Sequence, residues 1–329
     1  MADAPLSRRQ MLGLLGAGLL TACSPTRRES GTEATRERHL PPPTQTTTTA
    51  PTTTTTAAPQ FVSNLPPFDT VNPMSGFVAF GDFGGGPAQG QVAAGMLQWV
   101  RDGHRVDALV TTGDNVYDFG EPKFFEAHLK APYRALQNTG LPLWVTLGNH
   151  DVAGGHGDKQ LKFLGLPPLP YTKSLPGVRF LFLDGNRPGD EAQKKWLAEQ
   201  LAAPSPPLFT VAVFHQPIFS CGLHGRTPAV IEHWYSMLNG AVSLVLTGHD
   251  HHYERSLSAE GTTYIVTGGG GRELYPLFPL CNPPEQRVGR SKHHFTAVET
   301  YSDRMALTAV AIDGSILDQV DIPAALPSP

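Results

Sequence analysis

The chain has 329 residues, of which 34 are glycine and 31 are proline, and only 16% are charged. These figures exclude a coiled coil, a collagen-like chain and a wholly disordered chain, because each of those classes has a different composition. The length allows one large domain with additional segments, or two ordinary domains, and suffices to bury a core. The formal net charge of −4 leaves no strong basic field, so we expect no nucleic acid as a stable partner.

Residues 1–22 have the pattern of an export signal. A pair of arginines precedes the uncharged stretch 11–22, which is shorter than the roughly 20 residues that a membrane-spanning helix needs. The sequence SRRQML at residues 7–12 resembles the twin-arginine export motif. The sequence LTAC at residues 20–23 resembles the bacterial lipobox, which implies that Cys23 is lipidated and becomes the mature N-terminus. We therefore predict a signal peptide of the twin-arginine and lipoprotein type.

Residues 23–60 are predicted to form a lipidated N-terminus and a disordered stalk. The stretch 41–60 contains ten threonines, five prolines and no charged residue. Such a tract cannot bury apolar surface, so it stays extended, and it is a candidate for O-linked sugar. We expect the globular domain, residues 61–329, to be exported and held at the outer face of the bacterial cell membrane through the lipid anchor only.

The three cysteines of the chain suggest one covalent crosslink. If Cys23 carries lipid, Cys221 and Cys281 remain, and both lie in stretches rich in glycine and proline. In an oxidising compartment these two cysteines predict a disulfide, and the alternative is two unpaired thiols.

Short apolar runs that end in polar clusters begin near Gly76, and helical stretches lie between several of them. Runs of this length, rich in valine and phenylalanine, are typical of buried strands. The sequence predicts strands over 77–80, 106–112, 143–147, 178–183, 209–214 and 242–247, and then over 264–267, 295–301 and 304–312. It predicts helices over 91–101, 190–202 and 227–238, with Asp190 as an N-cap, and a hairpin turn at Asp313-Gly314. We therefore predict an α/β fold, a two-sheet β-sandwich flanked by helices, in a single domain.

Metal-binding side chains follow five of the predicted strands, at the point where each strand ends. They are Asp82, Asp114, Asn149, His215 and His249, and Tyr117 and His251 follow within three residues of two of them. Sites in α/β sheets form beyond the carboxyl ends of the strands. One such residue alone is more often a helix cap or a loop residue, but five together would require a counter-charge. Elsewhere, we interpret His293 and His294 as surface residues.

These seven side chains offer nitrogen and oxygen donors and no thiolate. That set suits Fe, Mn or Zn and argues against a closed structural zinc site. Seven ligands also exceed the number that one tetrahedral ion uses, so the sequence predicts two ions that share a carboxylate. Paired metals of this kind activate water and clamp the oxygens of a phosphoryl group.

Five short blocks of the chain resemble the calcineurin-like metallophosphoesterase superfamily. They are GDFG at 81–84, GDNVY at 113–117, GNHD at 148–151, HQP at 215–217 and GHDH at 248–251. Tyr117 narrows the resemblance to the purple acid phosphatases, and residues 190–271 are most similar to the tartrate-resistant type. The resemblance covers residues 76–313 and implies the metallophosphoesterase fold with a single catalytic domain.

The resemblance also implies a role for each residue of the blocks. Asp82, Asp114, Tyr117 and His251 would hold Fe(III), and Asp114 would bridge to a divalent Fe, Zn or Mn ion held by Asn149, His215 and His249. A metal-bound hydroxide would be the nucleophile. The resemblance further implies that His150 and His224 are catalytic: either would bind the substrate or protonate the leaving alkoxide. The chain departs from the family at Leu223, where the tartrate-resistant enzymes have an acidic residue. This difference favours His150 over His224 as the residue that protonates the leaving group.

The function that this resemblance implies is hydrolysis of small phosphate monoesters by an exported, membrane-tethered acid phosphatase. One alternative is a phosphodiesterase that uses the same two-metal site on nucleotides or phospholipid head groups. Another alternative is a non-catalytic metal-binding surface lipoprotein. A lost ligand would mark that last class, and none of the seven is missing.

Overall fold

The computed structural model describes residues 72–203, 207–278, 281, 283 and 285–324. The predicted signal peptide, Cys23 and the predicted stalk lie outside these residues. The chain divides into two units, 1–63 and 64–329, and all the described residues belong to the second. In the part of the chain that the structure describes, no helix is long and apolar enough to cross a membrane.

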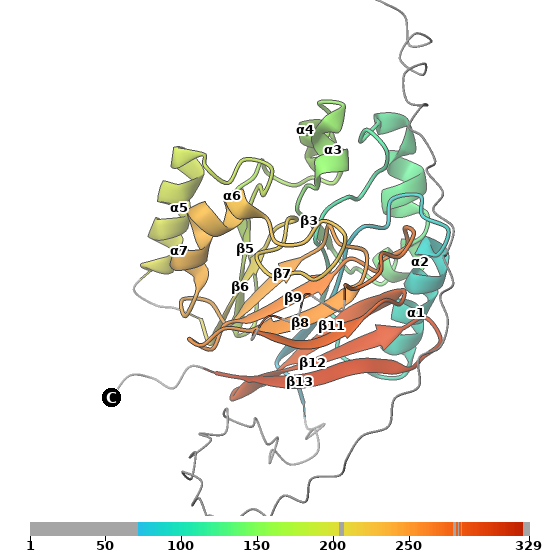
Figure 1. Cartoon of the computed structure of the whole chain (residues 1–329). Coiled ribbons are helices and arrows are strands. Elements are labelled where there is room, and N and C mark those ends of the chain that lie inside the picture. The colour runs from blue at the N-terminus through green and yellow to red at the C-terminus, as the bar shows by residue number, and fades with distance from the viewer. Residues whose placement is uncertain (1–71, 204–206, 279–280, 282, 284, 325–329) are drawn as a thin grey trace, which may run out of the picture. The chain divides into compact units, whose positions relative to one another are not determined.

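Two mixed β-sheets form the centre of the described domain (Figure 1). The first has six strands in the order β13 (Ile316–Pro323), β12 (Arg304–Ala311), β11 (His294–Thr300), β1 (Ser75–Phe80), β2 (Ala108–Thr111) and β3 (Leu143–Val145). The second has seven strands in the order β10 (Gln286–Arg290), β8 (Tyr253–Leu257), β9 (Thr263–Thr267), β7 (Leu244–Thr247), β6 (Phe209–Val213), β5 (Val178–Phe182) and β4 (Tyr171–Leu175). Strands β1–β3 are parallel to one another, and so are β5, β6, β7 and β9.

Helices lie on both sides of the paired sheets (Figure 1). Those that follow strands of the first sheet are α1 (Gln89–Arg101), η1 (Pro122–Phe124), η2 (Glu126–Lys130), α2 (Arg134–Gln137), α3 (Asn149–Ala153) and α4 (Gly157–Phe163). Those that follow strands of the second sheet are α5 (Glu191–Leu201), α6 (Pro228–Val230), η3 (Ile231–Tyr235) and α7 (Ser236–Leu238). The predicted fold class, a two-sheet sandwich flanked by helices, is confirmed.

Three hydrophobic layers hold these elements together, because alternate residues of a strand face opposite sides of its sheet. In β1, Phe77 belongs to the layer between the sheets, whereas Phe80 packs in the layer under α1. In β5, Phe180 faces the layer between the sheets, whereas Leu181 packs with Trp234 in the layer under α5 and α7. Strands covered on both faces are hydrophobic on both faces, which explains the continuous apolar runs of the sequence.

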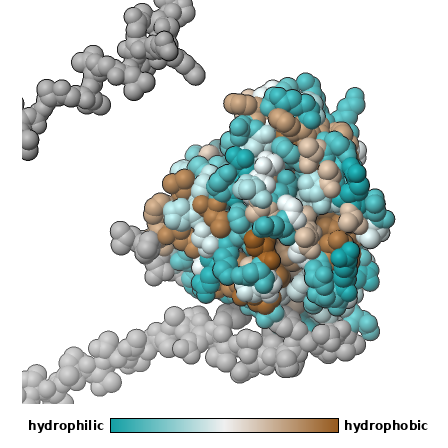
Figure 2. Space-filling view, turned by 90° about the vertical axis from the view of Figure 1, so that its right-hand side faces the viewer, coloured by the Kyte–Doolittle hydropathy of each residue, from teal (hydrophilic) through white to brown (hydrophobic). Residues whose placement is uncertain are grey.

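Polar residues dominate the outer face on the side of α1 and α2. Figure 2 shows this face as largely hydrophilic, with apolar residues in separate patches. The apolar side chains of these helices instead point inward: Val92 and Met96 of α1 are fully buried against the first sheet.

The predicted helix over 227–238 is present from Pro228 to Leu238, but its middle turn is π-helical. It consists of α6, the π-helical turn η3 and α7, and Thr227 makes no side-chain cap. Val230, Trp234 and Leu238 are spaced by four residues, and the wider turn keeps all three facing the second sheet. In contrast, Asp190 caps α5 as predicted, since its Oδ1 accepts a hydrogen bond from the backbone N–H of Gln193 at 2.9 Å.

The surface position predicted for His294 is also wrong. This residue begins β11 and is fully buried. Its Nδ1 donates to the carbonyl oxygen of Lys292 at 2.9 Å, and its Nε2 lies 3.1 Å from the hydroxyl of Thr267. Burial lowers the pKa of His294 to about 4, so the ring is neutral near pH 7. His293, next to it, is partly exposed.

The carboxyl ends of the parallel strands of both sheets meet. The backbone N–H of Gly81, just after β1, donates to the carbonyl oxygen of Thr267 at the end of β9 at 2.9 Å. The ring Nδ1 of His215, after β6, donates across to the carbonyl oxygen of Thr112, after β2, at 2.8 Å. The loops that carry the predicted ligands therefore converge from two sheets onto one place.

Candidate metal centre

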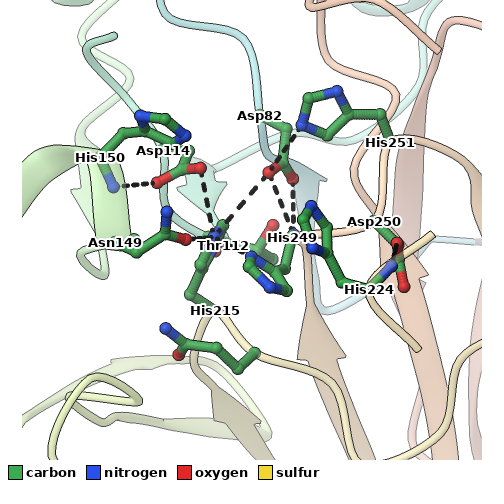
Figure 3. A network of polar contacts seen from close by, with 12 residues as sticks. Asp82, Thr112, Asp114, Asn149, His150, His215, His224, His249, Asp250 and His251 are labelled. Atoms are coloured by element: carbon green, nitrogen blue, oxygen red, sulfur yellow. Dashed lines mark hydrogen bonds and ion pairs between the residues drawn. The ribbon is translucent and has the colours of Figure 1, made fainter. Parts of the chain in front are cut away.

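Six of the seven predicted ligands lie in loops at the carboxyl ends of parallel strands, and the seventh, Asn149, is the first residue of α3. Asp82 follows β1, Asp114 and Tyr117 follow β2, Asn149 follows β3, His215 follows β6, and His249 and His251 follow β7. Figure 3 shows the acidic and imidazole side chains of these loops pointing toward one another. The structure thus brings together the residues that the sequence analysis selected.

Three of these residues adopt a left-handed backbone conformation that side chains other than glycine rarely take. The φ angles are 57° at Asp82, 51° at Asp114 and 71° at His249. Each such residue costs about 1–3 kcal/mol unless its surroundings impose the conformation. Here both oxygens of Asp82 accept a hydrogen bond from the backbone N–H of His249, each at 3.0 Å, so two of the three strained loops support each other. Strain of this kind concentrates at functional sites.

Two glycines allow these loops to approach the carboxylates closely. A Cβ on Gly148 would collide with the side chain and backbone of Asp114. A Cβ on Gly248 would collide with the carboxylate of Asp82 and the hydroxyl of Thr112. The glycines of the GNHD and GHDH blocks are therefore required by close packing beside the ligands.

One group of donors gathers around the phenol of Tyr117. Its Oη lies 2.9 Å from Oδ2 of Asp114, 3.2 Å from Nε2 of His251 and 3.5 Å from Oδ1 of Asp82. Nε2 of His251 lies 3.6 Å from the same Oδ1 of Asp82. Two ligands of one ion, each bound at about 2.0–2.2 Å, stand about 3 Å apart, so these four donors fit one metal ion.

A second group of donors gathers around the ring of His215. Its Nε2 lies 3.2 Å from Oδ1 of Asn149, 3.2 Å from Nδ1 of His249 and 3.3 Å from Oδ2 of Asp114. The same Oδ2 of Asp114 also faces the phenol of Tyr117. Asp114 therefore belongs to both groups, as a carboxylate shared by two ions would.

Backbone carbonyls set which ring nitrogen points into each group. Nδ1 of His251 donates to the carbonyl oxygen of Glu273 at 2.6 Å, and Nδ1 of His215 donates to that of Thr112. A carbonyl only accepts, so the remaining Nε2 of each ring faces the site, where it presents a lone pair once the ring is neutral. This arrangement is the one in which histidines bind metals.

Burial and charge act strongly on these groups. Burial raises the pKa of Asp82, and His215 only partly offsets this. Burial also raises the pKa of Tyr117, and the neighbouring carboxylates raise it further. For Asp114, burial is outweighed by His215 and His150, and its pKa lies below the usual range. Burial lowers the pKa of His215, but the two carboxylates outweigh it and raise the value to about 9.

These contacts show that the residues fit two metal ions. Asp82, Asp114 and His215 offer ligand atoms that all lie within 4.8 Å of one another, and all three residues are buried. Two adjoining buried carboxylates beside a phenol require positive charge, and bound cations supply it. At His249, burial and the ring of His215 lower the pKa to about 2, so the ring is neutral and its Nδ1 lone pair is free to bind a cation.

Asp151 holds two of the ligand loops in place. This fully buried carboxylate accepts hydrogen bonds from the backbone N–H groups of Asn115, Val116 and Gly148 at 2.8–3.1 Å. It also accepts from the side-chain amide of Gln160 at 2.8 Å. Asp151 stands in the GNHD block, but nothing in its position there indicates this role.

The two histidines predicted to be catalytic lie beside the donors. The backbone N–H of His150 donates to Oδ1 of Asp114 at 2.9 Å, and its ring lies 4.3 Å from that of Tyr117. The ring of His224 stacks on that of His249 at 4.2 Å. Both sit against ligands, His150 beside the first group and His224 beside the second.

Asp250 fixes the loop that carries His224. Its buried carboxylate accepts from the backbone N–H groups of His224 and Gly225 at 2.8 and 3.0 Å, and from the hydroxyl of Ser220. The position of Asp250 between His249 and His251 in the sequence does not indicate this role. The structure also joins Cys221, in the same loop, to Cys281 by a disulfide, with Cα atoms 5.4 Å apart.

The segment after β9 adds contacts that no sequence motif indicates. The guanidinium of Arg272 lies over the ring of Tyr117, 4.4 Å from its centroid. The ring of Tyr275 stacks on that of His251 at 3.9 Å and 11°. Both residues therefore border the first group of donors.

Comparison with known proteins agrees with this geometry. The sequence profile described as calcineurin-like phosphoesterase matches residues 76–253, more than half of the chain. The chain therefore belongs to the calcineurin-like phosphoesterase family.

Two relatives and one solved structure define the likeness further. Tartrate-resistant acid phosphatase type 5 of Rattus norvegicus is 28% identical over 303 residues, covering 75% of this chain and 90% of the relative. A cAMP/cGMP dual specificity phosphodiesterase of Mycobacterium tuberculosis is 35% identical over 138 residues, covering 37% of this chain and 41% of the relative. The structure of purple acid phosphatase PPD1 from yellow lupin, Lupinus luteus, matches with a TM-score of 0.68 at 18% identity, over 76% of this chain and 53% of the other. The chain is thus a metallophosphoesterase homologous to the acid phosphatases.

The two groups of donors predict distinct effects of substitution. Asn149→Ala and His249→Ala each remove a donor of the second group, so we expect loss of one of two metal ions and at least about a hundredfold loss of turnover. His150→Ala and His224→Ala serve as matched controls, since these side chains lie beside the donors, and should retain both ions. Metal analysis of the purified variants checks this. Two full equivalents of metal in both Asn149→Ala and His249→Ala would contradict the assignment.

Proposed function

We propose that the chain is a phosphatase that hydrolyses phosphate monoesters of small molecules. The observation that supports this most directly is the pair of donor groups that share Asp114, with two histidines beside them that belong to neither group. Bound cations would activate a water molecule and neutralise the charge of the phosphoryl group. The residues beside them would bind the ester and move protons.

His150 is suited to act as a general acid in this proposal. Its Nδ1 donates to the carbonyl oxygen of Asp118 at 2.9 Å, which fixes the ring and leaves Nε2 as the nitrogen that can carry a proton for transfer. A proton on Nε2 would pass to the oxygen of the leaving alcohol, a step worth roughly 10²–10⁴ in rate. His224, on the other side of the donors, is the second group within reach of the ester.

We propose Fe(III) for the group around Tyr117, with Fe, Zn or Mn as a divalent ion in the other. The phenol and two carboxylates make the first group rich in anionic oxygen donors, which suits the more highly charged ion. The second group, with Asn149, His215 and His249, has more neutral donors.

This assignment predicts colour. A phenolate bound to Fe(III) absorbs visible light, so the oxidised protein should be purple and Tyr117→Phe should lose the band while keeping its fold. The visible absorption spectrum and the iron content of both proteins measure this. A colourless, iron-free wild-type protein with full activity would exclude Fe(III) from the site.

The second candidate function is a phosphodiesterase with the same two-metal site. The observation that favours it is the likeness of part of the chain to the cyclic nucleotide phosphodiesterase of Mycobacterium tuberculosis. The likeness to the acid phosphatase covers twice as much of the chain, and we therefore prefer the monoesterase. A binding protein without catalysis is disfavoured because the seven donors are all present and converge.

Hydrolysis of two model esters separates these functions. We expect metal-replete protein to hydrolyse p-nitrophenyl phosphate with kcat/KM at least about a hundredfold above that for bis(p-nitrophenyl) phosphate. Release of nitrophenolate measures both reactions, and the Asn149→Ala variant controls for contaminating activity. The reverse preference would establish the phosphodiesterase, and no turnover of either ester would favour the binding protein.

We also propose that the chain is exported and tethered to the outer face of the cell membrane by lipid on Cys23. The arginine pair, the short apolar stretch and the LTAC sequence of residues 20–23 support this. The disulfide between Cys221 and Cys281 agrees with an oxidising compartment.

If lipid on Cys23 tethers the protein, substitution of Cys23 should release the protein from the membrane fraction. Wild-type protein should fractionate with membranes, and Cys23→Ala should lose the lipid attachment. Cys281→Ala is a matched control, because it removes a cysteine that the tether does not use. Immunoblots of membrane and soluble fractions, with mass analysis of the N-terminus, test this. An unmodified Cys23 in the wild-type protein would overturn the proposal.

A further inference from the structure

A contiguous apolar segment borders the candidate metal centre. Residues 274–278, with the sequence LYPLF, contain no charged or hydrogen-bonding side chain except the phenol of Tyr275. None of the five is buried, although leucine and phenylalanine normally lie in the core: Leu274, Tyr275 and Leu277 are partly exposed, and Pro276 and Phe278 are exposed. Contiguous apolar surface of this kind is typical of a binding site.

Tyr275 connects this segment to the site. Its backbone N–H donates to the carbonyl oxygen of His251 at 3.1 Å, and its ring stacks on the ring of that residue. The ring also meets that of His224, with centroids 5.5 Å apart at 66°. Tyr275 therefore touches a ring of the first donor group and the histidine beside the second.

A second apolar side chain comes from the loop of His224. Leu223 is 54% exposed, and Phe278 is 44% exposed. The backbone N–H of Phe278 donates to the carbonyl oxygen of Cys221 at 2.9 Å, and the disulfide to Cys281 joins the same two segments again. Loop and segment are thus held together on the side of the site where His224 lies.

The charged side chains near these residues already form ion pairs or hydrogen bonds with other groups. Arg226 pairs with Glu285 at 3.3 Å and lies over the ring of Phe219 at 4.8 Å. The carboxylate of Asp250 is buried and accepts backbone hydrogen bonds. Glu273, the residue just before the segment, pairs with Arg272 at 3.3 Å. Leu223 and Phe278 are the exposed large apolar side chains in these two segments.

We propose that Leu223, Tyr275 and Phe278 form a leaving-group wall that selects phosphate monoesters of apolar alcohols. The inference rests on the proposed phosphatase function, because the group that an ester loses must point toward the residue that protonates it. An alkyl or aryl leaving group would lie against the wall, whereas a polyol would lose water contacts there without apolar compensation. Each buried methylene favours binding roughly fourfold, so a six-carbon chain distinguishes the two clearly.

Two alkyl esters with similar leaving groups test the wall. Hexyl phosphate and glycerol 3-phosphate both release a primary alcohol, so their chemical steps are alike and their difference reports binding. We expect wild-type protein to prefer hexyl phosphate in kcat/KM by about tenfold or more, mainly through KM. Leu223→Ser, which removes the apolar side chain without adding a charge beside His224, should lower that preference at least about fivefold through its effect on hexyl phosphate. Phe278→Ser should do the same.

Leu208→Ser is the matched control. Leu208 is similarly exposed, at 43%, but precedes the amino end of β6, whereas the site lies at the carboxyl ends of the strands. It should leave the preference unchanged. If wild-type protein hydrolyses neither ester, the proposed function fails. If it hydrolyses both and neither Leu223→Ser nor Phe278→Ser alters the preference, the wall is excluded and the phosphatase stands.

Discussion

The structure depends on two carboxylates, those of Asp82 and Asp114, that are buried close to each other. Asp82 is 0% exposed and Asp114 is 2% exposed, and the phenol of Tyr117 faces both. Such a cluster is stable only where positive charge compensates it. Of the remaining donors only His215 gains a proton beside these carboxylates, and its ring must lose that proton to bind a cation, which then supplies the charge. Binding of cations therefore explains both the choice of donors and their deep burial. Hydrolysis of a phosphoryl group requires the same cations.

The fold meets this demand by joining the ends of two sheets. Parallel strands direct their carboxyl ends to one edge, and hydrogen bonds from Gly81 and His215 connect the two edges. Each ligand then needs only a short loop. The cost appears as left-handed backbone at Asp82 and His249, which the hydrogen bonds between these two residues help to impose. Strain and function thus occupy the same residues.

Much of this could be predicted because the information is local. A buried strand followed at once by Asp or His is visible in the sequence, and so is the spacing of His249 and His251. Strands such as β4 and β13 escaped prediction because they lie at sheet edges, where half of their residues face solvent and the apolar pattern weakens. The roles of Asp151 and Asp250 escaped because they depend on backbone N–H groups of other loops, which no residue pattern shows.

Family membership does not determine which phosphate ester the chain hydrolyses, so that preference depends on the residues around the metal donors. The calcineurin-like fold serves more than one chemistry, as its likeness to both an acid phosphatase and a cyclic nucleotide phosphodiesterase illustrates. Since the metal donors are shared, differences in substrate preference between such enzymes must come from the residues around the donors that contact the ester. In this chain the segment from Leu274 to Phe278 and the loop of His224 border the donors, since Tyr275 contacts the rings of His251 and His224. A disulfide and a backbone hydrogen bond join the two, so the parts of this surface are held together beside the metal site.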